Sequence, residues 1–430
     1  MRKMIHSHGT GLVTRSYWLS KHCRFQRGVC GLLCAALLLV AAAAPAAGQD
    51  DPPLDWQTAL ERTWEGYKQH FIFCGADCGN NLGLVFDPLI GYNAVSEGVG
   101  YGMLMAVVMN DQAAFDVIFN AANTYLWDQI AGLYHWRADN SGTITGRGSA
   151  TDADEDIALA LIFAHQRVLN GEWSPSATVA YDERANTIID AIFAREIYRG
   201  QYIIPGNEWY VDGQAITNPS YFTPAWYRIY DAFQGTDRWS AVIDQGYETI
   251  FATEGAPRGL TPDWSQADGA PAYPWCESGG STLQSCRYEM YYDAIRVPWR
   301  IGTDCLWFGE PRACEWVNRG ADFLLNETGR GNPDVAARMA RMYDMAGNPI
   351  VSHQDGTMIG MWLAGAVASD NDVLAGGLSR HMLHNYSTFV LSDGFWGTSW
   401  EDQDKYYVQS LAWLGAAVAG GIFENLYPIN

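Results

Sequence analysis

The chain has 430 residues, of which 48% are hydrophobic, and a formal net charge of −21. A chain this acidic repels nucleic acid and anionic membranes, so we expect neither as a partner. The charge is compatible with a neutral or cationic substrate, and the length with one large domain behind a short leader.

The first segment has the features of a secretory signal peptide. Residues 1–28 hold six basic residues and no acid, an apolar run follows from Val29 to about Ala44, and small residues continue to Gln49. A charged leader, a short apolar stretch and a small-residue end are typical of such signals, and the run is short for a membrane span. We therefore predict a signal peptide over residues 1–48 and a mature N-terminus between about residues 46 and 50. The protein would be secreted or periplasmic, with no membrane association after processing and a net charge near −27.

Residues 49–430 contain no Pro/Ser/Gly-rich linker, so we predict a single domain, and we expect a monomer. Six cysteines remain in this part, and an even number in an exported protein indicates disulfides. They form three close sequence pairs, which suggest bridges 74–78, 276–286 and 305–314. No CxxC or HExxH motif is present, so we expect no metal and no other cofactor.

Apolar residues recur at helical spacing along most of this domain. Trp56, Leu60, Trp64, Tyr67 and Phe71 predict a helix over 54–72. Similar patterns predict helices over about 97–109, 111–126, 154–169, 177–196, 222–234, 237–252, 312–327, 334–344, 355–368, 371–388 and 403–419. Long alternating stretches are scarce, which indicates an all-α fold of about twelve helices. Twelve helices in consecutive hairpins can close into an (α/α)6 barrel, although periodicity alone indicates only the all-α class.

Aromatic residues are abundant, with 18 tryptophans and 23 tyrosines. Buried tryptophan usually builds a hydrophobic core. Several tryptophans here, however, follow loop-like stretches rich in polar residues: Trp136, Trp209, Trp264, Trp275, Trp396 and Trp400. Flat rings beside acids and amides can stack on sugars while the polar groups bind hydroxyls, so the pattern suggests a saccharide cleft.

Three segments carry carboxylates in unusual settings. Glu97 lies at a helix start beside glycines 98, 100 and 102, which are costly in a helix unless another backbone or a ligand approaches closely. Residues 152–156 contain three Asp and one Glu, whose mutual repulsion should raise at least one pKa. Asp293 and Arg296 share a face if their segment is helical. Taken singly, these acids also fit helix-dipole complements or an internal ion pair.

Five segments, in order, resemble glycoside hydrolase family 8. They are SEGVGYGML at 96–104, ATDADEDIALALIFA at 150–164, NPSYFTPAWY at 218–227, YDAIRVPWR at 292–300 and YYVQSL at 406–411. The resemblance extends over essentially the whole predicted mature chain. It implies an (α/α)6 barrel and hydrolysis of a polysaccharide with inversion, in agreement with the helix count.

The resemblance also implies catalytic roles. Glu97 matches the general acid, and Asp293 matches the general base of the branch with bacterial endoglucanases and xylanases. Asp152 matches the carboxylate that holds and distorts the sugar at the cleavage point, with Asp154 as the alternative bearer of that role.

Further positions match residues that bind or position the substrate. Tyr221 matches a tyrosine that positions the water, and Arg296 an arginine near the base. Trp136 and Trp209 match sugar-stacking tryptophans, while Tyr406 and Tyr407 are expected at the far end of the cleft.

This chemistry sets physical requirements. Inversion needs a protonated acid and an ionised base about 6.5–9.5 Å apart, with a water between base and sugar. Glu97 must keep its proton near neutral pH through burial or a nearby negative charge, which Asp152 could supply. Arg296 would favour the ionised form of Asp293.

The form of the acidic segment resembles the cellulase branch, which favours an endo-β-1,4-glucanase acting on cellulose or a related β-glucan. Xylanase, mixed-linkage glucanase and chitosanase are the alternatives, although the family's chitosanases often lack the Asp at position 293. Outside this class stand a saccharide-binding protein with a degenerate site and a polysaccharide lyase, which would need basic residues for an anionic substrate. A role in biomass degradation or in cellulose synthesis is left open.

Overall fold

Twelve α-helices account for most of what the computed structural model describes, which is residues 55–74, 82–208, 216–272, 287–328, 336–351, 356–387, 394–397 and 403–429. All of these residues belong to the unit Pro52–Asn430. The predicted signal peptide lies outside the described residues. Within them, none of the helices is both long enough and apolar enough to span a bilayer.

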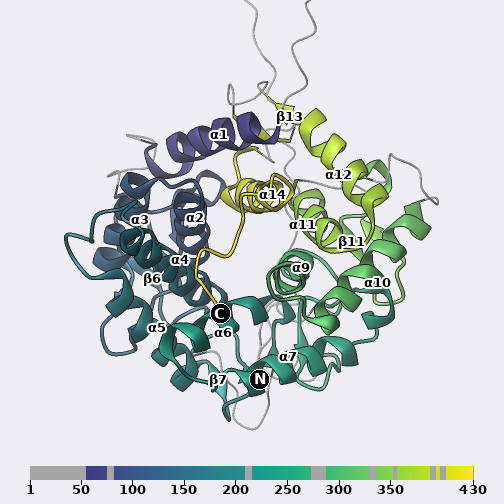
Figure 1. Ribbon diagram of the computed structural model, residues 1–430, viewed down its shortest axis with the longest axis horizontal. Coiled ribbons are helices and arrows are strands. Elements are labelled where there is room, and N and C mark those ends of the chain that lie inside the picture. Colours follow the sequence, from purple (N-terminus) through teal and green to yellow (C-terminus); the bar gives the residue numbers. More distant parts are fainter. Residues whose placement is uncertain are drawn as a thin grey trace, which may run out of the picture. The chain divides into compact units, whose positions relative to one another are not determined.

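Six of the helices form a closed inner ring. Each contacts the next, and the last contacts the first. They are α2 (Ser96–Val108), α4 (Thr151–Leu169), α6 (Pro224–Gln234), α9 (Val297–Phe308), α11 (Gly356–Ala368) and α14 (Tyr406–Ala419). Figure 1 shows this ring around the centre of the view.

The other six helices pack outside the ring, and each lies against an inner neighbour. They are α1 (Trp56–Tyr67), α3 (Gln112–Tyr125), α5 (Tyr181–Arg195), α7 (Ser240–Ala252), α10 (Pro311–Thr328) and α12 (Asp372–His384). Inner and outer helices alternate along the chain. The arrangement is an (α/α)6 barrel, which confirms the predicted fold class.

The apolar pattern of each helix explains its layer. Inner helices such as α2, α11 and α14 are buried on nearly every side. Outer helices such as α1 bury one face, with Leu60, Trp64 and Tyr67, and expose the other. Inner helices also approach closely: a Cβ added to Gly415 in α14 would lie 1.9 Å from the carbonyl oxygen of Gly360 in α11, so only glycine fits.

Short strands occupy the connections between helices. β1 (Phe86–Asp87), β2 (Asn93–Val95), β5 (Arg137–Ala138) and β6 (Ile144–Gly146) form an antiparallel sheet beside the start of α2. The remaining strands form two-stranded antiparallel pairs: β3 (Trp127–Asp128) with β4 (Leu133–Tyr134), β7 (Ile197–Tyr198) with β8 (Tyr202–Ile203), β9 (Ile216–Thr217) with β10 (Ser265–Gln266), β11 (Met342–Tyr343) with β12 (Pro349–Val351), and β13 (Tyr386–Ser387) with β14 (Phe395–Trp396).

Two of the helix assignments need correction. The helix predicted over 334–344 is wrong: the described part holds a 3-10 turn, Ala336–Arg338, and then β11. The N–H of Arg341 donates to Val351, because Gly347, with a φ of +89°, turns the chain back into a hairpin. Helix α9 was not predicted, because its first two turns are buried all round and it therefore has no solvent-exposed face there.

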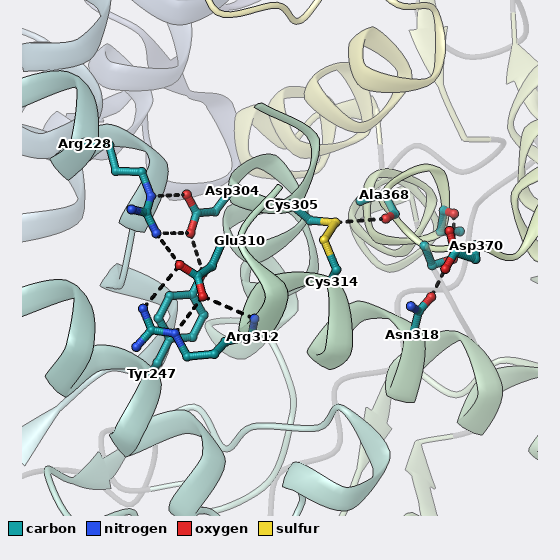
Figure 2. Close-up of a disulfide and its surroundings, with 12 residues drawn as sticks. Arg228, Tyr247, Asp304, Cys305, Glu310, Arg312, Cys314, Asn318, Ala368 and Asp370 are labelled. Carbon is teal, nitrogen blue, oxygen red and sulfur yellow. Dashed lines mark hydrogen bonds and ion pairs between the residues drawn. A yellow bond between two sulfur atoms is a disulfide. The ribbon is translucent and has the colours of Figure 1, made fainter. Parts of the chain in front are cut away.

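The predicted Cys305–Cys314 bridge is confirmed and joins the end of α9 to α10 (Figure 2). Beside it, the buried Asp304 accepts hydrogen bonds from Arg228 and Tyr247. Cys74 is also disulfide-bonded, but its predicted partner, Cys78, and the predicted 276–286 pair lie outside the described residues.

Removing the Cys305–Cys314 bridge should lower stability without lowering activity. A loop of sequence separation 9 predicts a loss of about 2–3 kcal/mol from the free energy of unfolding. The bridge lies at the end of α9 remote from Arg296, so kcat should be unchanged. Denaturant unfolding of the Cys305→Ser/Cys314→Ser variant tests this, and an unchanged midpoint would contradict it.

Candidate active site

A pocket of about 190 Å³ opens where several inner helices begin. Glu97 is the second residue of α2, Asp152 the second of α4, and Tyr406 the first of α14. Arg296 immediately precedes α9. Because inner and outer helices alternate, the inner helices run in the same direction and bring these N-terminal ends together. The residues lining the pocket are Val95, Ser96, Glu97, Trp136, Ala150, Asp152, Tyr221 and Tyr406.

The expected close approach at the α2 glycines is present. A Cβ on Gly100 would lie 2.9 Å from the Cβ of Asp156 and 3.3 Å from the carbonyl oxygen of Ala153, both in α4. A Cβ on Gly98 would lie 3.1 Å from the Tyr406 ring. These glycines therefore let α2 pack against α4 and α14, which places Glu97 beside Asp152 and Tyr406.

Arg296 is fully buried and links the acids of the site. Its Nη1 donates to Glu97 Oε2 at 2.6 Å and to Asp152 Oδ2 at 2.5 Å. Its Nη2 lies 3.6 Å from Asp293 Oδ1 and donates to Ser220 Oγ at 2.7 Å. A buried guanidinium is stable only when paired, and here it contacts three carboxylates.

Glu97 is placed to hold a proton. Its side chain is 20% exposed, and its Oε1 accepts a hydrogen bond from Tyr406 at 2.7 Å. Burial raises the pKa of Glu97 to about 8, Arg296 opposes the rise, and the charge of Asp152 adds to it. The carboxyl is therefore mainly protonated at neutral pH.

Asp293 is more open to solvent, with 35% of its side chain exposed. Its Oδ2 accepts a hydrogen bond from Trp264 Nε1 at 3.1 Å. Burial raises the pKa of Asp293 above its ordinary value, whereas Arg296 lowers it. Glu97 and Asp293 thus face different terminal nitrogens of one guanidinium, and the more exposed acid is the better candidate for contact with water.

The pH dependence of kcat/KM should be bell-shaped. The rate should rise as Asp293 loses its proton and should fall as Glu97 loses its proton, near pH 8. The descending limb therefore lies well above the ordinary range of a glutamate. A pH profile on a soluble substrate tests this, and activity already lost below neutral pH would contradict it.

The acidic segment points its side chains in different directions. Asp152 faces the pocket, whereas Asp154 is fully buried and accepts a hydrogen bond from the N–H of Tyr134 at 3.0 Å. Burial raises the pKa of Asp154 well above its ordinary value, and Glu196 adds to the rise. The expected raised pKa in this cluster is thus present, with burial as its main cause. Of the two candidates for holding the sugar, only Asp152 lines the pocket.

Some of the predicted binding residues line the pocket, and others do not. The ring of Trp136 lines the pocket and lies against Gly146, where a Cβ would be 2.3 Å from it. Tyr221 also lines the pocket, 5.2 Å from the Arg296 guanidinium. Tyr407 does not line the pocket, and its hydroxyl donates to the carbonyl of Tyr292. Trp209 lies outside the described residues.

Several residues that bind Arg296 or Asp293 were not predicted from the sequence. Ser220 accepts hydrogen bonds from Nε and Nη2 of Arg296, and Tyr101 lies 3.2 Å from Nη1. Trp264 was noted only as a loop tryptophan, although its indole N–H binds Asp293. Asp263, next to it, carried no sequence signal. In the described ranges, no group of three or more His, Cys, Asp or Glu residues is placed to hold a metal ion.

A carboxyl that holds its proton and a second, ionised carboxylate are the pair of groups that most glycoside hydrolases use. The chain belongs to glycoside hydrolase family 8: the family model described as "Glycosyl hydrolases family 8" matches residues 33–358. It is therefore a glycoside hydrolase.

Curated relatives include Endoglucanase A of Acetivibrio thermocellus, 35% identical over 70% of this chain. That match spans 59% of the relative's own length. Endoglucanase 2 of Ruminiclostridium josui is 34% identical over 86% of this chain and 73% of its own. Among solved structures, a β-1,3-1,4-glucanase from Paenibacillus sp. X4 has a TM-score of 0.70 and 25% identity over 85% of this chain and 92% of its own.

Proposed function

We propose that the protein hydrolyses internal β-1,4-glucosidic linkages of cellulose or a related β-glucan, with inversion. Glu97 is the general acid and Asp293 the general base. The proposal rests on the contacts of Arg296: one terminal nitrogen contacts Glu97, and the other contacts Asp293. Each carboxylate thus has its own contact on the guanidinium, an arrangement that is compatible with a water beside the base.

The proposed reaction is a single displacement. Glu97 gives its proton to the glycosidic oxygen as the bond to the anomeric carbon breaks. Asp293 takes a proton from a water as the remaining hydroxyl attacks the opposite face of the sugar. Asp152 faces the same pocket, where its charge would stabilise the positive charge that develops on the ring. Trp136 offers a flat ring for stacking at this pocket.

The names of the relatives favour a glucan substrate. Three curated relatives that are 33–35% identical to this chain are called endoglucanases. More distant matches include a reducing-end xylose-releasing exo-oligoxylanase from Halalkalibacterium halodurans, 29% identical over 58% of this chain. Xylan is therefore the second candidate substrate. Chitosan ranks below it, because the family's chitosanases often lack the Asp that this chain has at position 293.

Product analysis on carboxymethylcellulose, barley glucan, xylan and chitosan, side by side, tests the substrate. We expect short β-glucan oligosaccharides from the first two and a rapid fall in viscosity, as endo-cleavage requires. Glu97→Gln protein is the matched control for contaminating hydrolases. Faster release from xylan or chitosan would contradict the substrate assignment. Saccharide binding without any product would favour a degenerate binding protein.

We also propose export as a monomer without a cofactor. The basis for export is the leader over residues 1–48, and the basis for the absence of a metal is the lack of CxxC and HExxH motifs in residues 49–430. Intact mass measurement of protein collected outside the cytoplasm tests this, because retention of residues 1–45 would contradict cleavage.

A further inference from the structure

Two consecutive residues, Asp263 and Trp264, form hydrogen bonds with the segment that carries Asp293. Trp264 Nε1 donates to Asp293 Oδ2 at 3.1 Å. Asp263 Oδ1 accepts the backbone N–H groups of Tyr291 and Ala294, both at 2.9 Å. One buried carboxylate oxygen thus binds the backbone on both sides of Asp293, while the neighbouring indole binds the Asp293 side chain itself. We call Asp263 and Trp264 the base clasp.

The base clasp is itself anchored. The N–H of Asp263 donates to Glu289 at 2.9 Å, and the N–H of Trp264 donates to Arg287 at 3.0 Å. Met290, which follows Glu289 in the chain, forms two backbone hydrogen bonds with Tyr343 of β11. The segment before Asp293 is therefore held on two sides, and only 3% of Asp263 is exposed.

The two oxygens of Asp293 have different surroundings. Oδ2 is occupied by the indole N–H of Trp264, whereas Oδ1 faces Arg296 at 3.6 Å, longer than a hydrogen bond. A base needs one free lone pair directed at the water and a fixed orientation. The Asn218 side chain also lies close enough to lower the pKa of Asp293. Among the described residues, Oδ1 is the oxygen that the indole leaves open to a water.

We propose that Asp263 and Trp264 are positioning residues that direct Oδ1 of Asp293 at the attacking water. This inference rests on the proposed role of Asp293 as the base. In the step, one O–H bond of the water breaks, its proton goes to Oδ1, and the hydroxyl forms the new bond to the anomeric carbon. The leaving oxygen receives the proton of Glu97.

The clasp also acts on the charge of the base. Burial raises the pKa of Asp263, and the charge of Asp293 raises it further. Arg287, whose Nε lies 3.9 Å from Asp263 Oδ2, opposes this rise. Burial, Arg296 and Asp152 have the largest effects on the pKa of Asp293. The Trp264 hydrogen bond has a smaller effect, which favours the ionised form. Loss of the indole N–H should therefore raise the pKa of Asp293.

The test uses Trp264→Phe, which keeps an aromatic ring and removes the N–H. We expect kcat to fall with KM little changed, and the ascending limb of the kcat/KM profile to move to higher pH. Asp268→Asn, on the same connection with an exposed side chain, is the matched control and should leave the profile unchanged. An unshifted ascending limb in Trp264→Phe would overturn the role of Trp264.

Asp263 is tested by a pair of variants. Asp263→Ala removes the acceptor for both N–H groups, and misplacement of the base should lower kcat by about 10²-fold. Asp263→Asn keeps a carbonyl oxygen there and should recover most of that loss. A role limited to stability would lower the melting temperature of both variants while leaving kcat of the folded protein unchanged, which would overturn the proposal.

Asp293→Asn distinguishes a failure of the proposed base from a failure of the base clasp. If this variant keeps wild-type activity, the proposed base is wrong and the clasp loses its function. If Asp293→Asn is inactive but both clasp residues can be changed without effect on kcat or on the pH profile, only the clasp is wrong.

Discussion

Replacing Glu97 with glutamine should lower the hydrolysis of ordinary β-glucan by about 10²–10⁴-fold. The side chain keeps its shape and can still contact Arg296 and Tyr406, which hold it in the wild-type protein. The lost function is the proton that burial keeps on this carboxyl up to a pH of about 8. The leaving oxygen would then depart as an alkoxide, which is the costly event that the acid prevents.

The acid and base roles can be separated by the substrate. A β-glucoside with a good leaving group, such as a nitrophenolate, needs little protonation, so Glu97→Gln should lose less activity on it. Asp293→Asn should impair both kinds of substrate alike, because water activation is needed in each. Equal losses of Glu97→Gln on both substrates would remove Glu97 from the acid role.

Asp152→Asn should reduce kcat by about 10²–10³-fold, the range seen when one group that stabilises a transition-state charge is removed. Asp152 lines the pocket and supplies one of the charges on Arg296. It also helps to raise the pKa of Glu97. The residual activity of Asp152→Asn should therefore show a descending pH limb displaced to lower pH.

Asp154→Asn is the matched control within the same helix. Its Oδ1 accepts the Tyr134 N–H, a role that an amide oxygen keeps. Burial raises the pKa of Asp154 well above its ordinary value, so a neutral side chain of the same shape, such as asparagine, should be tolerated there. Activity and pH profile should stay close to wild type. A loss equal to that of Asp152→Asn would mean that the sugar is held by Asp154 or by both acids.

The fold class was predictable because outer helices have amphipathic patterns and inner helices have long apolar runs. Both patterns differ from the alternation of strands. The failures occur where tertiary contacts override local pattern. Helix α9 is buried on all sides through its first two turns, and its polar residues Arg300 and Asp304 lie in the interior, so no solvent-exposed face reveals its period. Residues 342–343 follow a helical pattern but pair with β12, because a turn at Gly347 brings the two strands together.

The acids of the site were predictable, whereas their partners were not. Glu97, Asp152 and Asp293 stood out through their motifs, and the structure brings all three to Arg296. Their different environments depend on burial and on contacts between distant segments. Asp263 lies 30 residues before Asp293 in the sequence and acts through backbone N–H groups, which leave no side-chain pattern to detect.

Proton NMR of the first product distinguishes inversion from retention at the anomeric carbon. If Asp293 activates a water on the face opposite the leaving group, the new reducing end has the α configuration before mutarotation. A carboxylate acting as nucleophile would instead lie only about 5–5.5 Å from the acid and would retain the β configuration. We expect the α-anomer signal to appear first and the β-anomer signal to grow later. An initial β product would contradict the mechanism and would point to Asp152, the other carboxylate that lines the pocket, as a nucleophile.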